Sequence, residues 1–179
     1  MRQLFFIFSI VCTLTVSAQR YKSSTSYIRF FSDAPLEDIE AVNEGSSSII
    51  DATTKAIVMV VPIKSFVFEK SLMQEHFNEN YLESDKYPNA TFKGKIQEWD
   101  GSIGKFSSKA TGTMEIHGVT QEVTLEGELE FDGKKMNVNS TFVIKLKDYK
   151  VKIPKAVFYN IAEEVEVTAQ FEYLPYEKN

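Results

Sequence analysis

Two histidines, His76 and His117, are the first candidates for chemistry in this chain. An imidazole can bind a metal ion or transfer a proton near neutral pH. The two residues fall on a predicted helix and at a predicted strand end, without the short paired spacing that is typical of a zinc site. They could share a metal ion with a nearby glutamate, but ordinary hydrogen-bonded or partly buried histidines fit the pattern better. We therefore predict no catalytic residues and no metal site.

The sequence contains no other set of residues that is typical of catalysis. Cys12 is the only cysteine, and no serine has the glycine flanks of a nucleophile elbow. Residues 101–105 read Gly-Ser-Ile-Gly-Lys, which lacks the spacing and the following helix of a phosphate-binding loop. The formal net charge is -5, with acids and bases interspersed, so no basic surface for nucleic acid is expected. The prediction is a protein that is not an enzyme and has no cofactor and no nucleic-acid partner.

The N-terminus has the pattern of a secretory signal. Arg2 precedes an apolar run over residues 4–16, and Ala18 is the small residue expected before a signal-peptidase cut. A run of about 13 apolar residues is too short to cross roughly 30 Å of hydrocarbon as a helix, so stable membrane insertion is not expected. A lipidated N-terminus at Cys12 is a further alternative, which Val11 before it disfavours. We predict a signal peptide over residues 1–18, a single domain over 19–179, and a periplasmic or secreted location.

Strict alternation of apolar and polar residues dominates the second half of the chain. Residues 123–131 and 136–146 alternate on either side of Asp132 and Gly133, a pair suited to a tight turn. Residues 165–173 alternate in the same way, and Pro175 is expected to end that strand. Further strands are predicted over residues 27–31, 47–51, 56–66, 90–99 and 106–116.

These segments make about eight strands with short connections, which favours an all-β, closed antiparallel barrel or a strongly curved pair of sheets. A transmembrane barrel is the rival, which a helical insert and a polar C-terminus disfavour. The insert begins at Ser71, where Ser71 and Gln74 have the spacing of a capping box. Met73, Phe77 and Tyr81 follow at helical spacing, so we predict one short amphipathic helix. We expect it to cover the outer face of strand 56–66, which is apolar on both sides.

Three segments of the chain resemble the YceI-like family of periplasmic polyisoprenoid-binding proteins. They are Met-Gln-Glu-His-Phe at 73–77, Tyr-Pro-Asn-Ala-Thr-Phe at 87–92, and Gly-Thr-Met-Glu-Ile-His-Gly-Val-Thr-Gln-Glu-Val at 112–123. The resemblance spans nearly the whole mature chain. It implies an extended lipocalin-like barrel of eight antiparallel strands that holds an isoprenoid tail inside. Residues 147–151 read Lys-Asp-Tyr-Lys-Val, where the family often has an arginine, an aspartate and a glycine-rich stretch.

The predicted function is therefore a binding protein that holds a long apolar isoprenoid or lipid tail, for carriage or sequestration. The alternative is a ligand-free structural or protein-interaction module, and two barrels could pair as a homodimer. The partner expected is an apolar small-molecule ligand. The helix residues Met73 and Phe77 are expected at the tail. The inward sides of the strands supply the other predicted lining residues: Val123, Leu125, Leu129, Phe131, Met136, Val138, Phe142, Ile144, Val165, Val167 and Phe171.

Overall fold

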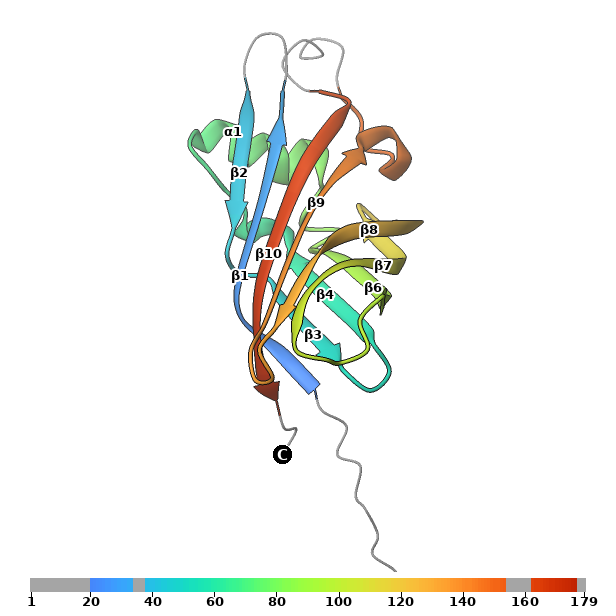
Figure 1. Ribbon diagram of the computed structural model, residues 1–179. Coiled ribbons are helices and arrows are strands. Elements are labelled where there is room, and N and C mark those ends of the chain that lie inside the picture. Colours follow the sequence, from blue (N-terminus) through green and yellow to red (C-terminus); the bar gives the residue numbers. More distant parts are fainter. Residues whose placement is uncertain (1–19, 34–37, 154–161, 177–179) are drawn as a thin grey trace, which may run out of the picture.

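The computed structural model describes residues 20–33, 38–153 and 162–176, and these form a closed antiparallel barrel (Figure 1). Each strand pairs with its neighbour in the order β1–β3–β4–β6–β7–β8–β9–β10, and β10 pairs with β1 to close the wall. The predicted eight-stranded barrel is confirmed. The strands are β1 (Arg20–Ser32), β3 (Ser47–Asp51), β4 (Ala56–Pro62), β6 (Asn89–Gln97), β7 (Gly104–Ile116), β8 (Val119–Phe131), β9 (Met136–Lys145) and β10 (Glu164–Tyr176).

Two short strands extend the wall at one end of the barrel. The first residues of β1 pair with β3, whereas its last residues pair with β2 (Ile39–Asn43). In turn β2 pairs with β5 (Val67–Phe68), which follows the 3-10 turn η1 (Ile63–Ser65). One long strand thus borders a different neighbour at each end, and the barrel is taller on the β1 side.

The predicted helix is present, and it lies at the taller end of the barrel. Helix α1 (Ser71–His76) continues into one π-helical turn, η2 (Phe77–Tyr81). The capping box is wrong, because Lys70 is the N-cap residue and Gln74 Oε1 accepts a hydrogen bond from the Phe68 amide instead. No helix in the described ranges is long and apolar enough to cross a membrane.

The predicted cover of strand β4 is also wrong. Val58, on the outer side of β4, is 40% exposed. The apolar residues Met73 and Phe77 of the helix instead border a cavity inside the barrel. An antiparallel sheet can keep one face in water, so an apolar outer residue on β4 needs no cover.

Several strand ends differ from the prediction: β1 begins at Arg20 instead of residue 27, and β4 ends at Pro62 instead of residue 66, because residues 63–65 form η1. The hairpin between β8 and β9 turns at Asp132 and Gly133 as expected, but its loop covers residues 132–135. Asp132 Oδ1 accepts from the Lys134 and Lys135 amides at 2.8 and 2.6 Å, and Gly133 has a φ of 96°. Pro175 does not end β10, because it lies opposite Tyr21 of β1 and the strand continues to Tyr176.

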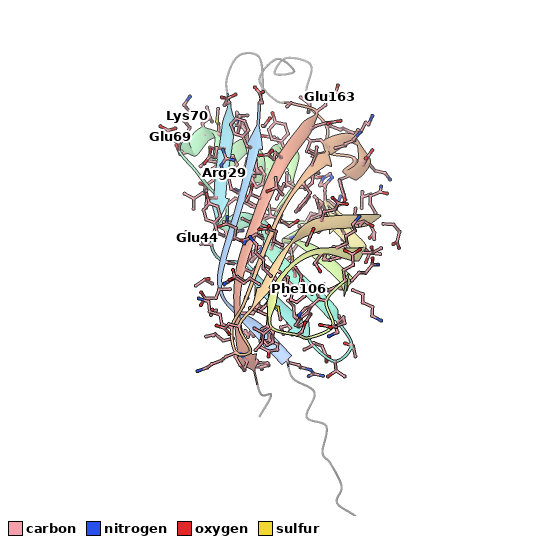
Figure 2. The ribbon with its side chains drawn as sticks, viewed as in Figure 1. Arg29, Glu44, Glu69, Lys70, Phe106 and Glu163 are labelled. Atoms are coloured by element: carbon pink, nitrogen blue, oxygen red, sulfur yellow. The ribbon has the colours of Figure 1, made fainter. Side chains whose placement is uncertain are left out.

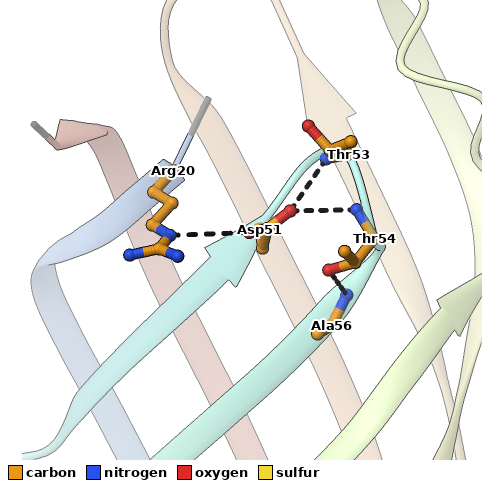
Figure 3. A network of polar contacts seen from close by, with 5 residues as sticks. All are labelled: Arg20, Asp51, Thr53, Thr54 and Ala56. Atoms are coloured by element: carbon orange, nitrogen blue, oxygen red, sulfur yellow. Dashed lines mark hydrogen bonds and ion pairs between the residues drawn. The ribbon is translucent and has the colours of Figure 1, made fainter. Parts of the chain in front are cut away.

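The end of the barrel opposite the helix is filled by side chains. The Tyr21 and Trp99 rings each meet the Phe131 ring edge to face, with centroids 5.6 and 5.8 Å apart. At the β3–β4 turn of this end, Asp51 accepts from the Thr53 and Thr54 amides at 3.0 and 2.9 Å (Figure 3). The hydrogen bonds from Thr54 lower the pKa of Asp51 most, and Arg20 and the Thr53 amide add smaller contributions. We call this half of the barrel, around Tyr21, Trp99 and Phe131, the packed half.

Candidate functional site

A cavity of about 390 Å³ occupies the other half of the barrel, below α1 and η2. Its wall is almost wholly apolar and comes from strands on all sides of the barrel and from the helix. Figure 2 labels Glu69 and Lys70 beside α1 and Glu163 before β10 at this end, whereas Phe106 lies nearer the packed half. The barrel is therefore hollow at one end and filled at the other.

Strand β10 shows where the hollow half ends. Its inward side chains are, in order, Val165, Val167, Ala169, Phe171 and Tyr173, and all five are buried. The first three border the cavity. The last two fill the packed half, with ring centroids 5.9 Å apart. The cavity floor thus falls between a small residue, Ala169, and a large one, Phe171.

Four phenylalanines cover the cavity beneath the helix. Phe77 of η2 stacks on Phe30 of β1, with centroids 5.5 Å apart and planes at 20°. The same ring lies 5.6 Å from Phe66 and 5.0 Å from Phe68. Aromatic pairs of this kind add roughly 0.5–1.5 kcal/mol each beyond the area they bury. We call Phe30, Phe66, Phe68 and Phe77 the aromatic cap.

His117 joins two segments that border the cavity. It lies in the turn between β7 and β8, where Nε2 is 2.6 Å from Glu83 Oε2 and Nδ1 is 3.2 Å from the Tyr149 carbonyl oxygen. The hydrogen bond from His117 lowers the pKa of Glu83, and Lys86 and Lys152 add to the effect. The Tyr87 ring packs edge to face on the imidazole, with centroids 4.7 Å apart.

The second histidine stands apart from the first. His76 is an exposed residue at the rim of the cavity. Within residues 20–33, 38–153 and 162–176, no three His, Cys, Asp or Glu side chains converge as a metal site. Both ring nitrogens of His117 are in polar contacts, and His76 lies in different surroundings at the cavity rim. The two histidines therefore do not share a site.

The model of the YceI-like domain family matches residues 20–173. The chain belongs to the YceI-like family. Protein YceI of Shigella flexneri is 34% identical over 79 residues, which are 41% of this chain and 39% of that protein. A UPF0312 protein of Pseudomonas putida (strain W619) is 29% identical over 94 residues, 49% of this chain and 47% of that protein. The chain thus spans about half the length of the curated relatives it matches.

Solved structures share the fold of this YceI-like chain at low sequence identity. A polyisoprenoid binding domain from Saccharophagus degradans superposes with a TM-score of 0.73 at 16% identity, covering 87% of this chain and 98% of that domain. BcnA of Burkholderia cenocepacia superposes with a TM-score of 0.69 at 19% identity, covering 82% of this chain and 95% of BcnA. The YceI protein of Campylobacter jejuni superposes with a TM-score of 0.57 at 18% identity, covering 99% of this chain and 100% of that protein. These similarities show the fold.

Seven of the predicted lining residues lie in the cavity wall of the YceI-like barrel. Phe142 and Ile144 are only half-buried although they face inward, because part of each side chain borders open space. Contact with a ligand stays a prediction for all seven: Met73, Phe77, Leu125, Phe142, Ile144, Val165 and Val167.

The other six predicted residues lie outside the cavity wall. Val123 and Val138 are half-buried and pack against the core. The remaining four are buried, three of them at the packed half's end of β8 and β9. Alternation shows which side of a strand faces inward, but it is the same in the hollow and the filled half. The four are Leu129, Phe131, Met136 and Phe171.

Part of the wall was missed from the sequence. Ile28 of β1, Met59 of β4 and Phe92 of β6 border the cavity, and the alternation of their strands could have identified them. Tyr149 and Val151 also border it. They follow β9 in the 3-10 turn η3 (Leu146–Tyr149) and the loop after it, where no periodic pattern marks an inward side.

Proposed function

We propose that this YceI-like protein holds the apolar tail of an isoprenoid or another lipid in the cavity, as a binding protein without catalytic activity. The observation that supports this is the hollow half of the barrel, with a cavity of about 390 Å³ lined by apolar side chains from β1, β4, β6 to β10 and the helix. A ligand-free module would gain stability by filling this space, since empty apolar cavities destabilise a core.

An apolar wall binds the hydrocarbon tail of a ligand rather than its polar head group. Each buried methylene contributes about 0.8 kcal/mol, so one isoprene unit offers on the order of 3–4 kcal/mol. Immobilising the ligand costs roughly 4–15 kcal/mol. A tail of one or two units should therefore bind weakly, and several units are needed for stable retention.

The fold shared with the polyisoprenoid binding domain of Saccharophagus degradans makes a polyprenyl chain the first ligand to test. The predicted signal peptide over residues 1–18 lies outside the described residues, and on it we base a periplasmic or secreted location. There the protein would carry its ligand between membranes or sequester it. Pairing of two barrels stays a prediction, which light scattering of the mature chain tests.

The experiment is mass spectrometry of the organic extract of mature protein, purified without detergent from its native compartment. We expect one long-chain lipid in about stoichiometric amount, and its mass gives the chain length. An empty extract, together with no uptake of long polyprenols by the refolded protein, would contradict the proposal.

A further inference from the structure

The barrel wall is not continuous between β8 and β9. Their ladder begins at the hairpin with Phe131 opposite Met136 and stops at Gly127 opposite Ser140. Beyond that point β8 stays paired with β7 as far as Val119, and β9 stays paired with β10 as far as Lys145. Figure 1 shows β8 turning away from β9 above their shared hairpin. Both strands therefore continue with one edge that has no ladder partner in the described part of the chain.

Polar contacts bound this gap at both ends. At its base the Ser140 hydroxyl donates to the Glu126 carbonyl oxygen at 2.6 Å. Gly127 allows close approach there, since a Cβ atom would lie 2.4 Å from the Asn139 carbonyl oxygen. At its top the side-chain amide of Gln121 donates, through Nε2, to the backbone carbonyl oxygen of Asp148 in η3 at 2.8 Å. We call the gap between residues 122–126 and 141–145 the side window.

The side window runs along the cavity. Leu125 of β8 and Phe142 and Ile144 of β9 flank it, and all three belong to the cavity wall. Five residues of each strand border it, a length of roughly 17 Å at about 3.3 Å per residue. On the outer side, Val143 is 55% exposed. Apolar side chains thus continue from the cavity to the surface at this place.

Side chains of the described residues lie over both ends of the cavity. The packed half closes one end with Tyr21, Trp99 and Phe131. The aromatic cap and the helix lie over the other, where the exposed side chains of Leu72 and His76 form the rim of the cavity. Leaving through a paired part of the wall would break ladder hydrogen bonds, each with a net contribution of about 0.5–1.5 kcal/mol. In the side window no such hydrogen bonds stand in the way.

We propose that the apolar ligand enters and leaves through the side window, so that its chain is laid in along its length instead of being threaded from one end. This inference rests on the proposed function. Side-chain movement of Phe142, Ile144 and Val143 then opens the path, while the barrel and its aromatic cap stay in place.

The first test bridges the window with a thiol-specific linker that a reductant cleaves. The variant carries Thr124→Cys and Val143→Cys in the mature chain, which has no other cysteine if the signal peptide is removed. The matched control carries Thr124→Cys and Thr111→Cys, a directly opposed pair in the intact β7–β8 ladder with hydroxyl oxygens 3.1 Å apart. The probe is a conjugated polyene fatty acid whose fluorescence rises in an apolar site.

We expect the bridge across the window to slow probe uptake about tenfold, as when binding requires a prior conformational change. Reductant should restore the rate, and the control pair should behave as the wild type. Uptake at the wild-type rate in the bridged window, or equal slowing in both pairs, would overturn the inference. If the wild type itself takes up neither this probe nor a long polyprenol, the proposed function fails instead.

A second test needs no bridge. A bulky polyethylene glycol maleimide is attached to Val143→Cys beside the window or to Leu174→Cys on β10, two exposed apolar positions on the outer surface. We expect slower uptake for the label at position 143 only. Equal rates for the two labelled proteins would contradict entry through the side window.

Discussion

His117 and Glu83 meet at 2.6 Å although both residues have left-handed backbone, with φ values of 52° and 44°. Such values are unfavourable for residues other than glycine, so the surrounding structure must stabilise them. The imidazole also reaches the Tyr149 carbonyl oxygen, which can only accept a hydrogen bond. The two ring nitrogens thus contact a carboxylate on one side and a carbonyl oxygen on the other. This contact ties the loop after η2 to η3, across the end of the cavity.

Replacing Glu83 by glutamine should therefore make stability less dependent on pH on the acidic side. The folded protein holds the pKa of Glu83 below its ordinary value, chiefly through the hydrogen bond from His117. The unfolded chain then binds a proton more readily, so the stabilisation is present above the unfolded pKa of about 4.3 and is lost as pH falls through the folded value.

The measurement is urea unfolding of the wild type and Glu83→Gln between about pH 7 and pH 3. We expect the wild type to be more stable at neutral pH and the two curves to converge in acid. Glu79→Gln, at an exposed position of η2, is the control and should follow the wild type. A constant difference between wild type and Glu83→Gln at every pH would contradict the role of the carboxylate charge.

The sequence predicted the barrel because alternation is a local property of each strand. Residues 123–131 and 165–173 show an inward and an outward side without reference to the rest of the chain. The same pattern could not separate Leu125, in the cavity wall, from Leu129, in the packed half. That difference depends on large side chains from other segments, such as Tyr21 of β1 and Trp99 of the loop after β6, which meet Phe131 only after the barrel closes.

Contacts between distant segments were likewise beyond the sequence. His117 and Glu83 stand 34 residues apart, and no spacing rule links a turn between strands to a loop after a helix. The side window had a weak local sign, because Gly127 and Ser140 interrupt the large inward residues of their strands. Their pairing is visible only from the register of β8 and β9.

Ala169→Phe should shorten the longest chain that the protein retains. The side chain at this position borders the cavity just above Phe171, so a phenyl ring there would raise the cavity floor. Overpacking costs about 1–3 kcal/mol in a filled core, and less is expected where the added ring enters open space. Incubation with a mixture of polyprenols, followed by mass spectrometry, gives the distribution of retained lengths.

Gln170→Phe is the matched control, since it adds the same ring to the exposed neighbour on β10. It should leave the distribution unchanged. A folded Ala169→Phe protein with the wild-type distribution would show that the ligand does not reach the cavity floor.

Two alanine substitutions should separate stability from ligand retention. Leu129 is 1% exposed in the packed half, so Leu129→Ala should lower the free energy of unfolding by about 2–5 kcal/mol. Phe142 is half-buried beside the cavity, so Phe142→Ala removes fewer contacts and should cost less. The effects on lipid retention should have the opposite order, with the larger loss at Phe142.

Urea midpoints of ligand-free protein report the first effect, with unchanged m-values as the check that the denatured state is the same. Retention of a polyprenol after gel filtration reports the second. If Leu129→Ala, still folded, lost the lipid as fully as Phe142→Ala, the division of the barrel into a hollow and a packed half would not describe binding.

Tyr173→Phe should make the protein more resistant to alkali while it weakens the fold slightly at neutral pH. The buried Tyr173 hydroxyl donates to Ser48 Oγ at 2.8 Å, and Ser48 donates onward to the Val58 carbonyl oxygen at 2.9 Å. Loss of the first hydrogen bond costs about 1 kcal/mol. Burial also raises the pKa of Tyr173 far above its ordinary value of 10.0.

The sign of the alkaline effect follows from that raised pKa. The stabilisation is fully present below the unfolded pKa of about 10 and is lost as pH rises above it, because only the unfolded chain ionises there. Tyr21, Tyr81 and Tyr149 also have a raised pKa, so both proteins should lose stability in alkali. Thermal unfolding from about pH 8 to pH 11 should show a shallower loss for Tyr173→Phe. Parallel curves would mean that Tyr173 ionises as readily in the folded barrel as in the unfolded chain, against its full burial between β10 and β3.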